Sequence, residues 1–287
     1  MSTTDLIYLH VGCEWSEPWD KSLESAIQAR GLRVRRCDLA TVCMDEPGAF
    51  MGRFSERGRD YRTNYAAQVR PFLWCWPEVS AFEMYDDKCL QAEWLAKHQY
   101  PQPAFEVVRQ GPAAWTQYPV VWKRPDGSAG KRVRLIQSAA EVVPPCLLQE
   151  FCPDNPGDYR ITVIGDQVSA IGRHNRPGDF RASGSGRSFL AVPDLELALL
   201  CWQICRRAGW GTMGFDVLQQ NGQWVITEMS YTYPIYSITD WTQQCWQFPQ
   251  QQLISRQEHP VDTLLDWLLR LEPQQSDQTR GGLGDPV

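Results

Sequence analysis

The chain has 287 residues, of which 43% are hydrophobic and 22% charged, and its formal net charge is -6. This length allows a large core and one to three subdomains, and the composition is ordinary for a soluble globular protein. The negative charge argues against general nucleic-acid binding, and no apolar run reaches the length of a membrane-spanning helix. Ten cysteines without a CxxC pair, in a sequence with no signal peptide, predict reduced thiols and a cytoplasmic location.

The N-terminal part has the pattern of a small open α/β domain. Residues 5–11 predict a buried strand, residues 20–30 a helix that stops at Gly31, and residues 32–39 a second strand. No GxGxxG motif follows the first strand, so a dinucleotide-binding fold is not supported. Residues 41–70 are polar and irregular, and their arginines suit either a surface for an anionic substrate or a solvated loop.

A lysine opens the helix that follows. The run Tyr-Asp-Asp-Lys ends at Lys88 and predicts a helix start, because either Asp86 or Asp87 can cap the first turn. The prolines Pro101 and Pro103 then break the chain and indicate a domain boundary.

A second lysine and a glycine-rich turn come next. Residues 118–123 predict a strand that delivers Lys123, and a glycine-rich turn over residues 124–131 leads to another strand. A Walker-type loop is excluded, because Pro125 stands where its first glycine belongs and Arg132 replaces the required Ser or Thr. The turn suits either a loop whose backbone N–H groups close over phosphates or a hairpin turn without a further role.

Acidic and basic residues alternate in the next part of the chain. Residues 146–151 predict a buried strand with Glu150 near its end, and the strand that follows carries Asp158 and Arg160 on one face. A cationic, glycine-rich run over residues 173–186 precedes an acidic hairpin. Such a run suits a polyphosphate site, or else a solvated basic loop.

The acidic hairpin, residues 210–230, reads as strand, tight turn and strand, with Asp216 on the first strand and Glu228 on the second. A two-residue Asn-Gly loop would pair Asp216 with Thr227 and turn Glu228 to the other face. We therefore expect a three-residue loop over residues 221–223 with a bulge, which pairs the two acids. Paired carboxylates repel unless a cation lies between them, and Mg²⁺ is the natural guest. The alternative is two solvated acids on an amphipathic hairpin.

Six of these elements, in this order, resemble the ATP-grasp superfamily over about residues 5–270. The matching elements are Asp-Asp-Lys88, Val-Val-Trp-Lys123 with Gly-Ser-Ala-Gly130, Leu-Leu-Gln-Glu-Phe151, Asp158-x-Arg160, and Gly-Phe-Asp216 with Glu228-Met-Ser230. The run from Arg173 to Gly186, with Glu-Met-Ser-Tyr231, is similar to the RimK-related branch. More narrowly, it looks like ATP-grasp proteins associated with capsule or cell-surface polysaccharide genes.

The resemblance implies an α/β (α+β) protein with the ATP-grasp fold, which holds ATP between two β-sheets. The implied parts are an N-terminal α/β domain over residues 1–85, a central lid subdomain over 86–150, a C-terminal subdomain with the metal site over 151–272, and a disordered tail over 273–287.

The resemblance also assigns roles to residues. Those implied to contact ATP phosphates are Lys88, Lys123, Gly127, Ser128 and Gly130. Those implied to hold adenine and ribose are Gln149, Glu150, Phe151 and Asp158. The implied ligands of Mg²⁺, with Mn²⁺ as an alternative, are Asp216, Glu228 and Ser230. The implied catalytic residues, which stabilise the transferred phosphate or orient a carboxylate, are Arg160, Arg173 and Arg181.

One departure from the family pattern stands out, because Ser230 occupies the place where an asparagine is usual. A hydroxyl is a weaker neutral ligand, which puts a second metal ion in doubt.

The implied reaction is ATP-dependent ligation of a carboxylate to an amine through an acyl phosphate, with release of ADP and phosphate. The implied substrates are small molecules (an amino acid, a peptide or a sugar acid), without nucleic-acid or membrane partners and with a homodimer as a possible assembly. Two alternatives stay open: a kinase on the same fold, and an ATP-binding protein without turnover.

Overall fold

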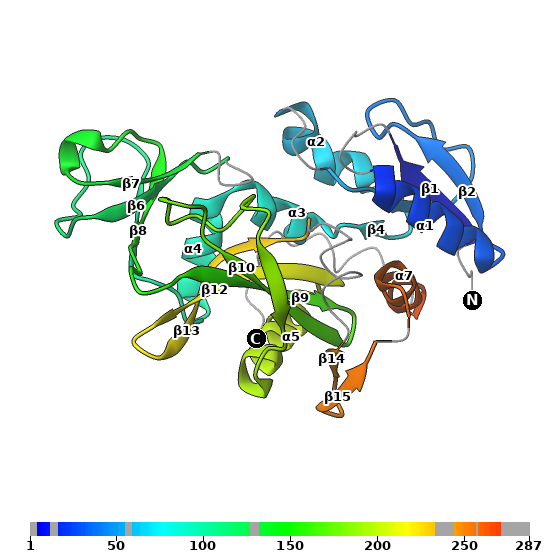
Figure 1. Ribbon diagram of the computed structural model, residues 1–287. Helices are drawn as coiled ribbons and strands as arrows, with labels where there is room; N and C mark the ends of the chain where they lie inside the picture. Colours follow the sequence, from blue (N-terminus) through cyan, green and yellow to red (C-terminus); the bar gives the residue numbers. More distant parts are fainter. Residues whose placement is uncertain are drawn as a thin grey trace.

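The computed structural model describes residues 5–11, 17–54, 59–126, 132–232, 244–256 and 258–270. These residues build three β-sheets with flanking helices, which confirms the expected mixed α/β class (Figure 1). The glycine-rich turn with Gly127, Ser128 and Gly130 lies outside the described residues, as does the tail over 273–287. No helix within the described ranges has the length and apolar character needed to cross a membrane.

The N-terminal sheet is parallel, with strand order β2-β1-β3-β4. Its elements are β1 (Leu6–His10), α1 (Glu17–Ala29), β2 (Arg33–Cys37), β3 (Ala49–Met51), α2 (Arg59–Val69) and β4 (Cys75–Trp76). The first strand, the first helix and the second strand confirm the expected pattern. Residues 41–70 are not irregular as expected, because they contain β3 and α2. β3 escaped notice because a three-residue strand, although fully buried, shows no periodicity.

Two helices lead from this sheet to a second one. They are α3 (Val79–Asp86) and α4 (Lys88–Lys97). The residue between them, Asp87, caps α4, because its carboxylate accepts hydrogen bonds from the backbone N–H groups of Cys89 (2.7 Å) and Leu90 (3.2 Å). The helix therefore begins at Lys88, as the sequence predicts.

The second sheet, called the small sheet below, is antiparallel with strand order β5-β8-β6-β7. Its elements are β5 (Phe105–Val108), β6 (Val120–Lys123), β7 (Val133–Ile136), a short 3-10 helix (Ala139–Glu141) and β8 (Cys146–Glu150). It encloses a core of its own around Val120, Ile136 and Leu148.

The third sheet, called the large sheet below, has strand order β13-β12-β9-β10-β14-β15, and β11 also pairs with β10. Its strands are β9 (Gly157–Ile164), β10 (Gln167–His174), β11 (Ser188–Ala191), β12 (Thr212–Gln220), β13 (Gln223–Ser230), β14 (Gln244–Gln247) and β15 (Gln252–Ser255). The helices α5 (Leu195–Ala208) and α7 (Pro260–Arg270) pack on it, and α7 also packs on α1. Arg30 joins these two helices by ion pairs to Asp262 and Asp266, each 2.7 Å.

The hairpin of β12 and β13 pairs Asp216 with Glu228, as expected, but by a different route. Its loop has two residues, Asn221 and Gly222, both with positive φ (52° and 78°), which is typical of a tight Asn-Gly turn. The extra residue is Thr227, at a bulge beside Asp216. The expected three-residue loop was wrong, because the pattern shows that one extra residue is needed without showing where it lies.

A tyrosine joins the N-terminal sheet to the end of β13. The Tyr231 hydroxyl accepts a hydrogen bond from the Phe54 N–H (3.0 Å) and donates one to the Phe54 carbonyl (3.3 Å). Its ring packs edge-on against Trp76 and Tyr85, and both bonded residues are buried.

We expect Tyr231→Phe to lower the free energy of unfolding by about 1–3 kcal/mol, because the buried Phe54 N–H loses an acceptor while ring packing is kept. Urea or thermal unfolding measures the loss. Tyr100→Phe is the control, since its hydroxyl accepts a 3.4 Å contact from Arg207 near the surface. Equal effects in the two variants would contradict a stabilising role for the Tyr231 hydroxyl.

Candidate active site

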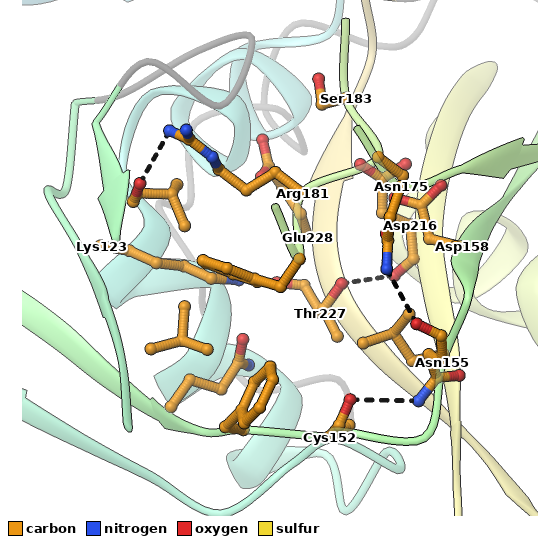
Figure 2. A pocket seen from close by; sticks show the side chains of 18 of the residues that line it. Lys123, Cys152, Asn155, Asp158, Asn175, Arg181, Ser183, Asp216, Thr227 and Glu228 are labelled. Atoms are coloured by element: carbon orange, nitrogen blue, oxygen red, sulfur yellow. Dashed lines mark hydrogen bonds between the residues drawn. The ribbon is translucent and has the colours of Figure 1, made fainter. Parts of the chain in front are cut away.

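A cleft of about 250 Å³ lies between the small sheet and the large sheet (Figure 2). It is bounded by β6, β7 and β8 on one side and by β9, β12, β13 and the loop after β10 on the other. The expected site residues that line it are Lys123, Gln149, Glu150, Phe151, Asp158, Arg181, Asp216 and Glu228. The structure therefore brings together residues from positions 123 to 228 of the chain.

Part of the cleft lining is an apolar slot. Val121, Val133 and Leu218 line it, and the rings of Phe151 and Phe180 meet edge-on with centroids 5.7 Å apart. Polar atoms of the β8 end lie beside these apolar walls, at Gln149 and Glu150 in the same lining. An apolar slot with a few polar groups suits a flat heteroaromatic base.

The cleft also holds a buried lysine. Lys123 Nζ donates a hydrogen bond to the Thr227 carbonyl (2.9 Å), which belongs to the bulge of β13. Burial lowers the pKa of Lys123 to about 8, and the nearby charge of Lys88 lowers it too, whereas Glu228 and Asp216 act in the opposite direction. Burial thus makes the charged form of Lys123 less favourable, and an anionic ligand beside the ammonium would offset this desolvation penalty.

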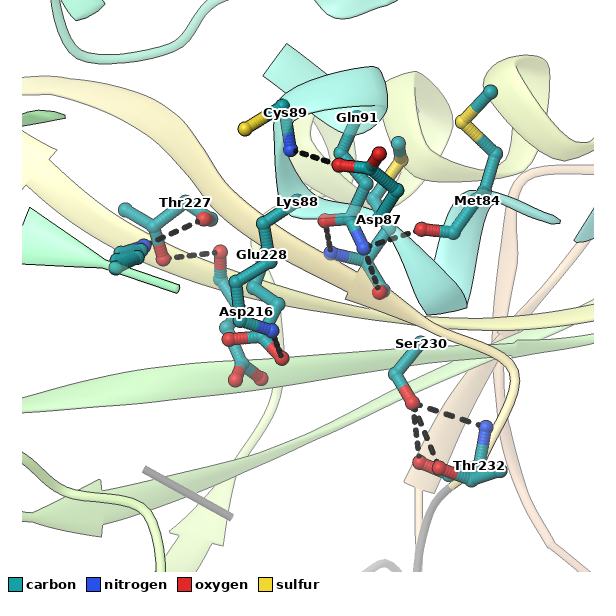
Figure 3. A network of polar contacts seen from close by, with 12 residues as sticks. Met84, Asp87, Lys88, Cys89, Gln91, Asp216, Thr227, Glu228, Ser230 and Thr232 are labelled. Atoms are coloured by element: carbon teal, nitrogen blue, oxygen red, sulfur yellow. Dashed lines mark hydrogen bonds and ion pairs between the residues drawn. The ribbon is translucent and has the colours of Figure 1, made fainter. Parts of the chain in front are cut away.

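A second buried lysine, Lys88, pairs with Glu228 (Figure 3). Lys88 Nζ is 2.8 Å from Glu228 Oε1, and the Lys88 side chain is only 4% exposed. Because Lys88 is the first residue of α4 and Glu228 lies on β13, this ion pair links the helix that precedes the small sheet to the large sheet.

Two arginines share the carboxylate of Asp216. It pairs with Arg160, including a 2.8 Å bond from Nη2, and with Arg173 Nη2 at 2.9 Å. Arg173 also binds Asp158 through two bonds of 2.6 and 2.7 Å. Strand register brings these groups together, because Arg160 stands opposite Asp216 and Arg173 opposite Asp158.

Burial and the arginines act in opposite directions on these carboxyls. Burial alone would raise the pKa of Asp216, but Arg160 and Arg173 outweigh it and hold that pKa well below its usual range. For Asp158 burial prevails and its pKa is raised, although Arg173 opposes the rise. Lys88, Arg160 and Arg173 each meet a carboxylate, whereas Lys123 donates to a backbone carbonyl, so an anionic ligand could neutralise the charge of Lys123 directly.

The remaining expected residues have other partners. Arg181 reaches across the cleft, where it pairs with Asp179 (2.6 Å) and donates to the Val133 carbonyl of the small sheet (3.1 Å). Ser230 Oγ donates to the Thr232 carbonyl (2.8 Å) and does not appear in the cleft lining. The structure therefore does not place Ser230 in the cleft with Asp216 and Glu228.

Several residues of the cleft carry no motif and were not foreseen. Asn155 bonds the backbone N–H and C=O of Gln219 through its amide, and Asn175 donates to the Asn155 carbonyl. Thr227 offers its backbone carbonyl to Lys123, which no side-chain pattern can reveal, and its hydroxyl donates to the Asp216 carbonyl (3.1 Å). Phe180 stands next to Arg181 in the sequence, and this position beside an expected site residue was the signal that could have indicated its place in the cleft.

The acid pair fits a magnesium ion. Asp216 and Glu228 stand opposite one another and offer hard oxygen donors. Within the part of the chain that the structure describes, no cluster of three or more His, Cys, Asp or Glu could hold a metal unaided. Magnesium characteristically binds through one or two carboxylates together with substrate phosphates. The residues therefore suit an ion that is completed by a bound nucleotide.

Residues 85–238, more than half of the chain, match the family described as the RimK-like ATP-grasp domain. No curated protein matches the chain in sequence. The narrower resemblance to proteins of capsule or cell-surface polysaccharide genes stays a prediction.

Solved structures match nearly the whole chain. A RimK domain ATP-grasp protein from Sphaerobacter thermophilus is 17% identical, with a TM-score of 0.63, over 91% of this chain and 98% of its own. The D-cycloserine synthetase DcsG is 15% identical, with a TM-score of 0.65, over 92% and 98%. The ATP-grasp ligase PsnB, complexed with a minimal precursor, is 16% identical, with a TM-score of 0.60, over 92% and 99%. At these identities the matches establish the ATP-grasp fold.

The depressed pKa of Lys123 makes stability depend on pH. Between pH 8 and pH 10.5 the unfolded chain binds the Lys123 proton and the folded chain does not, so the free energy of unfolding rises across this window. Relative to Lys123→Met, the native protein should gain on the order of 3 kcal/mol between pH 7.5 and pH 10.5. Urea unfolding of both proteins at both pH values, without nucleotide or metal, measures this gain. If the free energies of unfolding of the two proteins differed by the same amount at both pH values, the lowered pKa of Lys123 would be contradicted.

Asp216 should support the fold as well as the site. Asp216→Asn removes the charge that two buried guanidinium groups share, and we expect a loss of about 3–5 kcal/mol in the free energy of unfolding. Asp126→Asn is the matched control, because that carboxylate also bridges two arginines but is 32% exposed. Its loss should stay below about 1 kcal/mol. Comparable losses would show that burial does not set the strength of these pairs.

Proposed function

Because the chain belongs to the RimK-like ATP-grasp family, we propose that it is an ATP-dependent ligase that joins a carboxylate to an amine. The observation that carries this proposal is the cleft itself. It combines apolar walls with the buried Lys123 and two opposed carboxylates, and the buried Lys88 pairs with one of these acids. A purine base and a polyphosphate offer the apolar ring and the negative charges that such a lining can bind.

The chemistry explains why ATP is required. A carboxylate is a poor electrophile, because oxide is a poor leaving group. Transfer of the γ-phosphoryl group to a carboxylate oxygen releases ADP and gives an acyl phosphate. The amine then attacks the acyl carbon, the C–N bond forms, the C–O bond to phosphate breaks, and the amine loses a proton. No nucleophilic side chain is needed, so positioning and charge neutralisation suffice.

The residues divide this work between them. Lys123 and Lys88 bind the phosphates, and Gln149, Glu150 and Phe151 hold the adenine. Asp216 and Glu228 hold Mg²⁺, which would neutralise and orient the phosphates when bound. A PsnB structure solved with Mg and ADP supports this assignment by analogy.

We infer that Lys88 exchanges its partner when a nucleotide binds. Lys88 and Glu228 neutralise one another at 2.8 Å. A nucleotide phosphate offers Lys88 another partner, which frees Glu228 for the metal. Arg181 already spans the cleft to the small sheet, where it can meet the transferred phosphoryl group. Arg160 and Arg173 act on this site through Asp216 and Asp158, and Asp158 stays our candidate for ribose.

The similar proteins bracket the substrate without naming it. They include a D-cycloserine synthetase and a ligase bound to a precursor peptide, so an amino acid, a peptide or a sugar acid each fits the class. We also propose the division at residues 85 and 150, with residues 86–150 as the lid, a homodimer as the assembly, and the cytoplasm as the location where ATP is supplied.

The proposal is tested by ATP turnover with Mg²⁺ against pooled amino acids and uronic acids. ADP and free phosphate should appear in equal amounts, only when an acid and an amine are both present. Glu228→Ala should reduce turnover by about 100-fold or more. Mass spectrometry of the active pool should then find an amide.

Other outcomes point to other functions. ADP without free phosphate, with a phosphorylated acceptor, would establish a kinase. ATP binding without turnover in every mixture would favour a binding protein, and absence of ATP binding would overturn all three.

A further inference from the structure

Among the strands that the structure describes, β13 lies at one end of the large sheet, so none of them pairs with the backbone groups along its outer edge. Other segments cover this edge. The Ile226 N–H donates to the Pro101 carbonyl (2.9 Å), and Lys123 Nζ donates to the Thr227 carbonyl (2.9 Å). The next group along the edge is Met229, directly after Glu228.

Met229 is bound by the side chain of Gln91, from α4 (Figure 3). Gln91 Oε1 accepts from the Met229 N–H (2.8 Å), and Gln91 Nε2 donates to the Met229 carbonyl (2.8 Å). The amide thus makes the two hydrogen bonds that a neighbouring strand would make. Gln91 is 3% exposed, so little water competes for these bonds.

The Gln91 amide also contacts the backbone where α3 ends and α4 begins. The Lys88 N–H donates to the Pro125 carbonyl (3.1 Å) and does not continue the ladder of α3. The Met84 carbonyl at the end of α3 is therefore left for another donor, and Gln91 Nε2 supplies it at 2.6 Å. One buried side chain consequently holds the end of α3, the start of α4 and the edge of β13.

This arrangement places two neighbouring pairs in register. Lys88 and Gln91 are three residues apart and share one face of α4. Glu228 and Met229 are adjacent on β13. When Gln91 bonds Met229, Lys88 is brought to Glu228, which it meets at 2.8 Å. We propose that Gln91 is a positioning residue that sets Lys88 against Glu228 and against the phosphates of the nucleotide. The nucleotide part of this inference rests on the proposed function.

The test is a double-mutant cycle on ATP affinity, measured by calorimetry with Mg²⁺. If Gln91 acts through Lys88, Gln91→Leu should weaken ATP binding by about tenfold or more, as expected for a misplaced hydrogen bond to a charged group. In a Lys88→Met background the same change should cost less than about twofold, because no ammonium is left to position. Equal losses in the two backgrounds would overturn the proposal.

Gln102→Leu is the matched control. Its amide also donates to α4, at the Ala92 carbonyl (2.9 Å), but it holds no atom of β13. ATP affinity should stay within about twofold of the native value, because the Lys88–Glu228 geometry is untouched. A loss as large as that of Gln91→Leu would overturn the proposal, because any loosening of α4 would then be enough.

Gln91→Glu keeps the proposal testable if Gln91→Leu does not fold. A protonated carboxyl can still accept from the Met229 N–H and donate to the Met229 carbonyl, whereas a carboxylate cannot donate. Burial should raise the pKa of the introduced carboxyl. Relative to native protein at the same pH, ATP affinity should recover at pH 5.5 and fall at pH 8, and a flat ratio would overturn the proposal. A native chain that bound no ATP would overturn the proposed function itself, whereas native binding with additive losses overturns only the role of Gln91.

Discussion

Two carboxylates that face each other across a hairpin impose the main constraint on this structure. Asp216 and Glu228 are paired across β12 and β13, and in a partly buried site their charges repel strongly. Each is neutralised by cations from a different direction. Arg160 and Arg173 approach Asp216 from within the large sheet, and Lys88 approaches Glu228 from α4. These countercharges bring α4 and four strands, β9, β10, β12 and β13, together at one point.

The bulge at Thr227 makes both halves of this arrangement possible. Without the extra residue, Asp216 and Glu228 would point to opposite faces of the hairpin, since side chains alternate along a strand. With it, the acids share a face, and the Thr227 carbonyl is left to accept from Lys123. A single irregularity therefore pairs the acids and anchors the lysine of the small sheet beside them. That one bulge has both effects is consistent with the frequent occurrence of bulges next to active sites.

The sequence predicted those parts of the site that are local. Asp87 as a cap places Lys88 at the start of α4, and alternation places Asp158 and Arg160 on one face of β9. Pairing between strands was accessible only where a turn constrains it, and even there the location of the bulge was not. Contacts such as Arg173 with Asp216 depend on the order of strands in the sheet, which periodicity does not encode. β3 was overlooked because three residues are too few for any pattern.

The acids of the site are held on a rigid backbone, whereas its lysines have long, flexible side chains. The acids lie on short side chains of a hairpin that amides hold at both ends, Gln91 at Met229 and Asn155 at Gln219. In each case one amide bonds both the N–H and the C=O of one residue, so the backbone there has little freedom to shift. The lysines stand on long, flexible stems and hold their partners through single contacts. Fixed acids with adaptable cations suit the proposed function, in which phosphate oxygens would replace carboxylate and carbonyl oxygens as partners of the lysines while the two acids keep their spacing.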